Sequence, residues 1–519
     1  MEIKVIWKTA RCAVLEIADG GIYETKEEYT ILLNHKLYGK TKKVITSLYG
    51  LKPDTEYEVC VEGEKGSEKI SFCTEHEFVT LNVKDFGAKG DGKQDDTTFI
   101  QAAIMSCPKQ SRILIPKGIY KIRSLFLKDD IRIELAEGAV LSAYTDRTLF
   151  PILQDVIQSY DEKEEYNLGT WEGNPLPMFA GIVTGIGVKN VEIYGQGMIE
   201  GNAGKEEGNW WYQPKIMNIA FRPRMLYLNH CENVTVQGIQ VQNSPSWNIH
   251  PYFSDHLKFL DLKILNPKDS PNTDGLDPES CCDVELAGIY FSLGDDCVAV
   301  KSGKIYMGAK YKKPSEDILI HQCCMRDGHG SITIGSEMAG GVKRLTVKDC
   351  LFLHTDRGLR IKTRRGRGKD AIIEDIVFEN IHMDHVMTPF VINSFYYCDP
   401  DGHTEYVRSR EVLPVDERTP DIRTLKFKDI DAENCHVAAA YMCGLPEQKI
   451  RKVEMENVKV SYTDQPTAGV PAMMEGAEEV TKMGIYAYNV EELILRNVKI
   501  EGQDGEELIA QGTNVIWED

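Results

Sequence analysis

Three aspartates lie in two short polar motifs whose residue types could do acid and base chemistry. Asp274 is part of residues 272–277 (NTDGLD), and Asp295 and Asp296 form an adjacent pair after a glycine. If these motifs meet in space, like charges disfavour joint ionisation and at least one carboxyl keeps its proton. Inverting hydrolysis of a glycosidic bond needs a proton donor for the leaving oxygen and a carboxylate that activates water. The aspartates therefore favour glycoside hydrolysis.

Basic residues follow the aspartates in two further motifs. His329 lies between two glycines, and Arg360 and Lys362 are two positions apart. Because side chains alternate along a strand, both cations would point to one face and could grip one carboxylate, which suits an acidic sugar. The neighbouring cations form a basic island in an acidic protein, which predicts local attraction of a polyanionic sugar. They are Arg357, Arg364, Arg365, Arg367 and Lys369.

Each motif alone has a simpler structural interpretation. The sequence NTDG is more often an Asx turn, an aspartate pair is usually a solvated corner, and a histidine between glycines could be a tight turn. The arginine-rich run alone could be a solvated face or a nucleic-acid contact. A calcium site at Asp274 and Asp277 lacks the EF-hand spacing. Four motifs in order, with complementary chemical roles, favour catalysis.

Short strands that repeat along most of the chain must position these motifs. From residue 113 onward apolar residues alternate, an Asn, Asp or Gly makes a turn, and a second short strand begins. The units recur at roughly 23 to 34 residues through the middle of the chain, which is the period of one coil of a parallel β-solenoid. Loops inserted at one corner of such coils line up and form a groove. Examples of the unit are residues 191–195, 234–239, 345–350, 376–381, 425–430 and 493–498.

The first part of the chain differs in texture. Residues 1–80 contain short alternating strands between turn residues, the pattern of a small β-sandwich. Within it, residues 51–57 (LKPDTEY) resemble the corner motif of fibronectin type III domains. A turn region rich in Gly and Asp follows, then a predicted helix over residues 97–107. We therefore predict two domains, a fibronectin type III-like sandwich over 1–80 and a solenoid over 81–519.

The four motifs, in this order, resemble the signatures of the polygalacturonase family, glycoside hydrolase family 28. The resemblance extends from about residue 85 to beyond residue 397, through residues 85–92, 193–202, 243–247 and 334–337. It implies an all-β fold, a right-handed parallel β-helix of the pectin-lyase type, and hydrolysis of α-1,4-linked galacturonate in pectin. One departure is Gly294, where fungal endo-acting members carry Gln; this bears on subtype and leaves the chemistry intact.

The same resemblance implies a role for each site residue. Asp295 would be the general acid, while Asp274 and Asp296 would hold and deprotonate the water. His329 would lie near the acid and tune its protonation. Substrate would be bound by a further set: Asn272, Arg360, Lys362 and one of the adjacent pair Tyr396 and Tyr397, whose register the neighbouring aromatic residues leave open.

Composition limits the partners and the compartment. A net charge of -20 and a pI of about 5.2 argue against nucleic acid or an anionic membrane as a partner. Residues 1–8 alternate like a strand rather than a secretory leader, so we expect a cytoplasmic protein, or a secreted one if a leader has been removed. The 14 cysteines show no CxxC spacing, which predicts reduced core thiols. No metal or cofactor is expected, and the oligomeric state is open.

The position of the cut along a polymer is a separate question. An exo mode is favoured by the missing leader, since only imported short oligomers would reach a cytoplasmic enzyme. It is also favoured by inserted segments at about 145–180, 203–222 and 400–420, which could wall off one end of the groove. The alternatives are an endo-polygalacturonase, a rhamnogalacturonan-directed hydrolase, a calcium-dependent pectate lyase and a glycan-binding solenoid without turnover.

Overall fold

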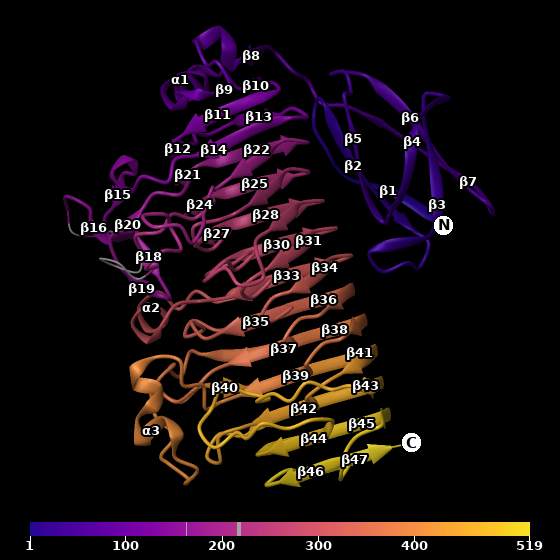
Figure 1. Cartoon of the computed structure of the whole chain (residues 1–519), viewed down its shortest axis with the longest axis vertical. Coiled ribbons are helices and arrows are strands. Elements are labelled where there is room, and N and C mark those ends of the chain that lie inside the picture. The colour runs from indigo at the N-terminus through magenta and orange to yellow at the C-terminus, as the bar shows by residue number, and fades with distance from the viewer. Residues whose placement is uncertain (162, 164, 215–219, 519) are drawn as a thin grey trace.

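An N-terminal β-sandwich and a long parallel β-helix make up the computed structural model, which describes residues 1–161, 163, 165–214 and 220–518 (Figure 1). The inserts predicted at 145–180 and 203–222 therefore lie partly outside the described residues. The sandwich pairs a three-stranded sheet with a four-stranded sheet, in the orders β1-β2-β5 and β4-β3-β6-β7. Its strands are β1 (Glu2–Lys8), β2 (Cys12–Ala18), β3 (Glu24–Leu33), β4 (Lys36–Lys43), β5 (Ile45–Tyr49), β6 (Glu56–Gly63) and β7 (Gly66–Cys73).

The sandwich confirms the expectation from the sequence motif at its corner. The hydroxyl of Tyr57 accepts a hydrogen bond from the backbone N–H of Lys52 at 2.9 Å, which ties the start of β6 back to the preceding loop. Alternate residues of β2, β3 and β6 are buried and form the core between the two sheets. The core includes Leu15, Ile17, Ile31, Val59 and Val61.

The parallel β-helix begins with β8, which pairs with β10 in parallel. The largest sheet of the β-helix has 23 described strands. These strands are β8 (Thr80–Asn82), β9 (Asp91–Asp95), β10 (Arg112–Ile115), β11 (Gly118–Ile122), β13 (Ile131–Leu135), β14 (Ala139–Ala143), β22 (Lys189–Gly195), β23 (Met198–Glu200), β25 (Glu232–Gln237), β26 (Gln240–Gln242), β28 (Asp255–Leu260), β29 (Lys263–Leu265), β30 (Cys282–Ala287), β31 (Tyr290–Leu293), β33 (Ser315–His321), β34 (Cys324–Asp327), β36 (Val342–Leu353), β38 (Ile372–Asp384), β40 (Asp421–Ile422), β41 (Thr424–Cys435), β43 (Ile450–Tyr462), β45 (Val490–Glu501) and β47 (Val515–Glu518).

A second face of the helix is built from two parallel sheets that isolated bridges at Leu276 join into one surface. The four-stranded sheet contains β12 (Leu125–Phe126), β21 (Val183–Ile186), β24 (Leu226–Asn229) and β27 (Ile249–Tyr252). The seven-stranded sheet contains β32 (Val298–Val300), β35 (Ile332–Gly335), β37 (Arg357–Lys362), β39 (Thr388–Asn393), β42 (Ala438–Cys443), β44 (Met483–Tyr488) and β46 (Leu508–Gln511). The described residues form three α-helices, α1 (Thr97–Ser106), α2 (Ile305–Tyr311) and α3 (Glu405–Arg408).

The repeated strand pattern explains why the coils stack in register. Leu345, Ile376, Leu425, Val453 and Leu493 occupy the same position in successive coils, each paired with the next, and all are buried. Such a column of aliphatic side chains removes apolar surface from water along the coils from β36 to β45. The predicted parallel β-helix is confirmed.

The repeated Asn or Asp at the turn has a conformational reason. Asp349, Asn380, Asp429, Asn457 and Asn497 all have φ between 49° and 53°, the left-handed region that these residue types tolerate best. Their side chains also bond between coils: the Asn457 amide donates to Asp429 at 2.8 Å, and the Asn497 amide donates to Asn457 at 2.8 Å. These Asn and Asp residues therefore bend the chain within each long strand and link neighbouring coils.

The sandwich packs against the 23-stranded sheet, on the side of the helix opposite α2 and α3 (Figure 1). Val14 and Ile45 of the sandwich share a buried apolar cluster with Leu260 and Ala287 of the helix. Polar contacts surround it, among them Lys43 with Asp261 at 2.6 Å. The sandwich therefore contacts a face that the seven-stranded sheet does not form.

All 14 cysteines are unbridged and eleven of them are buried, as expected for reduced core thiols. Among the described residues, no helix is long and apolar enough to cross a bilayer.

A glycine substitution tests the docking of the sandwich. A Cβ on Gly288 would overlap the side chain of Ile45, whereas a Cβ on Gly187 meets nothing within 4 Å; both glycines have positive φ. We expect Gly288→Val to lower the free energy of unfolding by about 1–3 kcal/mol more than Gly187→Val does, because only the first adds a steric conflict. Calorimetry of the sandwich transition measures this. Equal losses in the two variants would contradict the close packing.

Candidate active site

The four motifs meet on the outward face of the second surface of the helix. Leu276 pairs with Val298, which pairs with Ile332, which pairs with Leu359, so these inward residues align the coils. Asp274 and Asp296 lie two positions before Leu276 and Val298, so they are neighbours in successive coils, and the backbone N–H of Gly275 donates to the carbonyl oxygen of Asp296 at 3.0 Å. One carboxylate oxygen from each of Asp274, Asp295 and Asp296 lies within 4.8 Å of the other two. The structure brings the three predicted aspartates together.

Asp296 is held by the two cations of the Arg-Ile-Lys motif. Arg360 Nη1 lies 3.2 Å from one carboxylate oxygen, and Lys362 Nζ lies 2.9 Å from the other. Asp296 is buried, which opposes its charge, but Lys362 and Arg360 outweigh burial and hold its pKa well below the usual range. Asp296 is therefore ionised and fits a base that takes a proton from water.

Arg360 and Lys362 thus share a contact with Asp296 that their two-residue spacing alone does not predict. They were predicted to grip a carboxylate of the substrate, and the carboxylate they contact here belongs to Asp296. Their side chains remain 12% and 11% exposed at the edge of the site. Binding of a substrate carboxylate by this pair stays a prediction.

The pKa values of Asp274 and Asp277 are shifted in the opposite direction to that of Asp296. Burial, followed by the nearby charges of Asp295 and Asp277, raises the pKa of Asp274 well above its usual value. Burial also raises the pKa of Asp277, and among the described residues neither of its oxygens has a hydrogen-bond partner. Two carboxyls that favour the neutral form therefore surround the ionised Asp296, as the crowding argument predicts.

Asp295 and His329 lie at the open side of the cluster. The imidazole Nδ1 of His329 is 3.3 Å from a carboxylate oxygen of Asp295, and the His329 side chain is 53% exposed. The hydrogen bond to Asp295 raises the pKa of His329. A Cβ on Gly330 would come within 2.8 Å of an Asp296 oxygen, so a larger residue would crowd the site. The glycine next to the histidine is thus required for space.

The remaining predicted residues divide between the site and its surroundings. Lys362 Nζ lies 5.6 Å from the ring centre of Tyr396, which is buried beside it. Tyr397 instead packs against His403, with ring centres 5.0 Å apart. The side-chain oxygen of Asn272 accepts a hydrogen bond from Arg222 at 2.8 Å. The structure brings Tyr396 to the cluster and not Tyr397; substrate binding by Asn272 and either tyrosine stays a prediction.

The predicted basic island on the surface is wrong for three of its arginines, because they are buried. Arg364 is ion-paired with Asp399 and Asp401, both at 2.8 Å, Arg365 with Glu447 at 2.6 Å, and Arg367 with Asp399 at 3.4 Å. A buried guanidinium needs such partners to offset its lost hydration. These residues anchor the inserted segment after residue 398 and do not form a field for a distant polyanion.

Two further charged residues at the site were missed in the sequence. Lys301 Nζ lies 3.3 Å from Glu337 and 3.9 Å from Asp274, with the ring of Trp247 at 4.6 Å. Burial disfavours both charges, but Glu337 raises the pKa of Lys301 and Lys301 lowers the pKa of Glu337. Each residue therefore favours the ionised form of the other. The available signal was a lysine at the end of the apolar run CVAV, a position that water rarely reaches.

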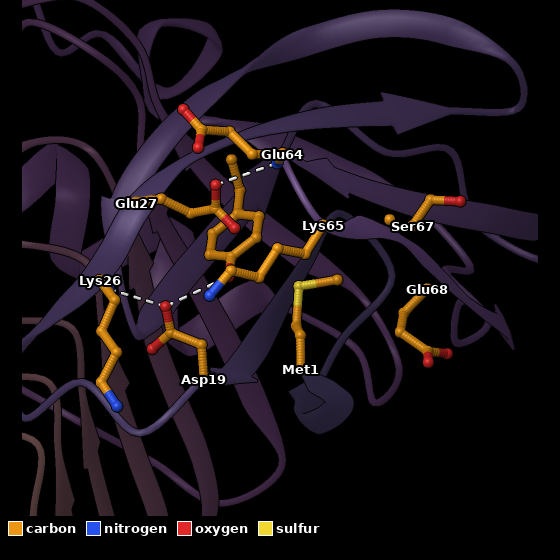
Figure 2. Close-up of a pocket in the computed structure, with 10 residues that line it drawn as sticks. Met1, Asp19, Lys26, Glu27, Glu64, Lys65, Ser67 and Glu68 are labelled. Atoms are coloured by element: carbon orange, nitrogen blue, oxygen red, sulfur yellow. Dashed lines mark hydrogen bonds between the residues drawn. The ribbon is translucent and has the colours of Figure 1, made fainter.

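A separate hollow of about 450 Å³ lies on the sandwich (Figure 2). Two of its acidic side chains are engaged locally: Asp19 accepts from the backbone of Lys26 at 2.7 Å, and Glu27 accepts from the backbone of Glu64 at 2.9 Å. The hollow belongs to a different domain from the three aspartates and contains none of the predicted site residues.

Comparison with known proteins finds similar sequences and similar folds. A family model described as "Glycosyl hydrolases family 28" matches residues 110–478. A "Probable polygalacturonase" of Vitis vinifera is 28% identical over 73% of this chain and 74% of its own length. An "Endo-polygalacturonase" of Pectobacterium carotovorum subsp. carotovorum is 28% identical over 70% of this chain and 84% of its own.

Among solved structures, the "Family 28 Exopolygalacturonase" of Yersinia enterocolitica aligns with a TM-score of 0.75 at 20% identity. The alignment covers 99% of this chain and 98% of that chain. At this identity the likeness shows the fold, here over both the sandwich and the helix.

The charge state of Asp296 can be tested without a substrate. Lys362→Met removes one of the two cations that contact Asp296, so the pKa of Asp296 should rise. During acidification the carboxylate of Asp296 should then be protonated at a pH about one unit or more higher than in the wild type. Infrared titration measures the carboxylate band, with Asp296→Asn identifying it. Lys369→Met, an exposed lysine paired with Glu417 at 2.7 Å, is the control and leaves the band unchanged. An unshifted titration in Lys362→Met would contradict the clamp.

Proposed function

The chain belongs to family 28 of the glycosyl hydrolases, and from that premise we propose that it hydrolyses α-1,4-galacturonosidic bonds with inversion and from a chain end. The observation that carries the chemistry is the three-aspartate cluster with one member held ionised. Asp295, the more exposed carboxyl beside His329, protonates the leaving oxygen. Asp296 deprotonates a water held with Asp274.

Inversion is favoured by how Asp296 is held. The carboxyls are closer than the roughly 6.5–9.5 Å usual for inverting pairs, and a short separation suits a covalent nucleophile instead. However, Asp296 is buried and both of its oxygens are engaged, one by Arg360 and one by Lys362. A water can reach such a group more readily than the carbon of a sugar ring can. The cluster therefore supports water activation over a glycosyl-enzyme.

Galacturonate is favoured by the charges around the reacting position. Arg360 and Lys362 are cations within a strongly acidic protein, and His329, whose pKa is raised by its hydrogen bond to Asp295, lies with them beside the aspartates at an accessible edge. Their spare N–H groups can bind the carboxylate of the sugar on which the aspartates act. A neutral sugar would offer their spare N–H groups no anionic partner, so it would gain less from binding there.

An exo mode is supported by an inserted hairpin beside the site. Its strands are β18 (Thr170–Trp171) and β19 (Asn174–Pro175). Trp171 stacks on Trp247 with ring centres 5.1 Å apart, and a Cβ on Gly173 would come within 2.6 Å of the backbone nitrogen of Lys304. The hairpin tip thus lies against the loop that follows Lys301. This contact supports a blocked end on the side of the earlier coils.

Product analysis tests the reaction and its mode together. With trigalacturonate and with homogalacturonan we expect galacturonic acid as the first product, because a closed end admits only a chain terminus. A ladder of oligomers from the start would show an endo mode. Proton NMR of the first product should show the β-anomer, since inversion converts an α-linkage; an initial α-anomer would contradict inversion. Absorbance of an unsaturated product would show a lyase.

The role of Asp295 separates catalysis from binding alone. Asp295→Asn removes the proton donor, so kcat should fall by about 10²–10⁴-fold while trigalacturonate still binds in calorimetry. Asp317→Asn, an exposed aspartate paired with Arg344 at 2.6 Å, is the control and keeps full activity. Equal turnover in Asp295→Asn and wild type would contradict the assignment.

A further inference from the structure

A segment near the C-terminus folds back over the face that carries the site. Gly469 and Val480 pair with each other through both backbone N–H groups, at 3.1 and 3.0 Å, and so close the base of a loop. Inside the loop, the carbonyl oxygens of Val470 and Pro471 accept hydrogen bonds from Arg357, at 2.6 and 2.9 Å. The loop therefore begins against β37, the strand that carries Arg360 and Lys362.

Met473 lies next to the clamp of Asp296. Its sulfur accepts a hydrogen bond from Arg360 Nη2 at 2.9 Å, while Arg360 Nη1 contacts Asp296. The carbonyl oxygen of Met473 accepts from the side-chain amide of Asn393 at 3.0 Å. Because Asn393 is the register partner of Lys362 in the next coil, Met473 covers the position immediately beyond the clamp.

The neighbours of Met473 cover the coils that follow. Ala472 and Met474 are buried in one apolar cluster with Val391 and Tyr441. Val391 and Tyr441 are successive register partners of Arg360, so they continue its outward row. A sugar chain that extended past Arg360 along this row would meet the loop.

Glu475 joins the loop to the inserted segment after residue 398. Its carboxylate lies 3.4 Å from His403 and 3.4 Å from Arg408. The same insert is tied to the coil of the site, because Asp399 pairs with Lys304 at 3.3 Å. Lys304 in turn contacts the hairpin tip at Gly173. Among the described residues the contacts thus run from the hairpin through the insert to the loop, and the edge at His329 is exposed.

We propose that residues 469–476 are a specificity-determining loop that closes the cleft beyond Arg360 and restricts the substrate to short galacturonate oligomers. This inference rests on the proposed function. With the hairpin on the side of the earlier coils and the loop on the side of the later coils, the site is a pit with room for few sugars. A longer oligomer must bend away from the sheet face or displace the loop, so its binding is weaker.

The test compares kcat/KM for di-, tri-, tetra- and hexagalacturonate. In the wild type we expect kcat/KM for the hexamer to be about tenfold below that for the best short oligomer, the usual size of a steric penalty at a subsite. Replacing residues 471–475 by Gly-Ser-Gly should raise the hexamer-to-dimer ratio by about the same factor. The ratio is internal to each protein, so an effect of lost Met473 on Arg360 cancels.

A point variant avoids the risk that the shortened loop misfolds. Glu475→Ala keeps the apolar anchors, frees the loop from His403 and Arg408, and should raise the same ratio by about threefold. Glu405→Ala is the matched control, because it removes only the exposed partner of Arg408 at 2.7 Å and should leave the ratio unchanged. Equal kcat/KM from dimer to hexamer in the wild type, or an unchanged ratio in both loop variants, would overturn the proposal. Absence of turnover on every galacturonate would instead refute the proposed function, and this inference with it.

Discussion

The ion triplet of Asp296, Arg360 and Lys362 is the interaction on which the rest of the site depends. It joins Asp296 to two residues that lie 64 and 66 positions further along the chain, and it exists only because the coils stack in register. A buried carboxylate without these cations would take up a proton, because in a site without water the neutral carboxyl has a lower free energy than the unpaired charge. With them it stays charged among carboxyls that favour the neutral form. The fold therefore sets a difference in protonation between chemically identical side chains.

Much of the helix was predictable because its determinants are local. Alternation of apolar residues specifies strands, and an Asn or Asp that tolerates positive φ specifies the turn between them. Repetition of that unit then specifies stacking, since no single coil can bury its own apolar face. The sandwich was predictable for a similar reason, from short strands and the corner at Tyr57. The aspartates were found because their motifs are short and ordered along the coils.

What could not be predicted depends on partners far away in the chain. Arg364, Arg365 and Arg367 looked like one exposed island, and each is buried because Asp399, Asp401 or Glu447 meets it from another segment. The loop at 469–476 has no apolar period of its own and gains its position from contacts with Arg357, Arg360 and Asn393. Adjacent tyrosines gave no sign of which one faces Lys362, because both follow the end of β39 in irregular backbone, where no alternation of faces sets their directions.

The placement of the sandwich gives the molecule two faces with separate uses. Val14, Ile45, Leu260 and Ala287 bury the contact on the flank of the 23-stranded sheet, whereas the aspartates lie on the sheet that contains β32 and β37. The sandwich supplies no wall of the pit, and a change at its outer surface has no direct path to the reacting groups. A molecule held there would be kept away from the pit rather than delivered to it. The two domains thus meet away from the reacting groups in this architecture.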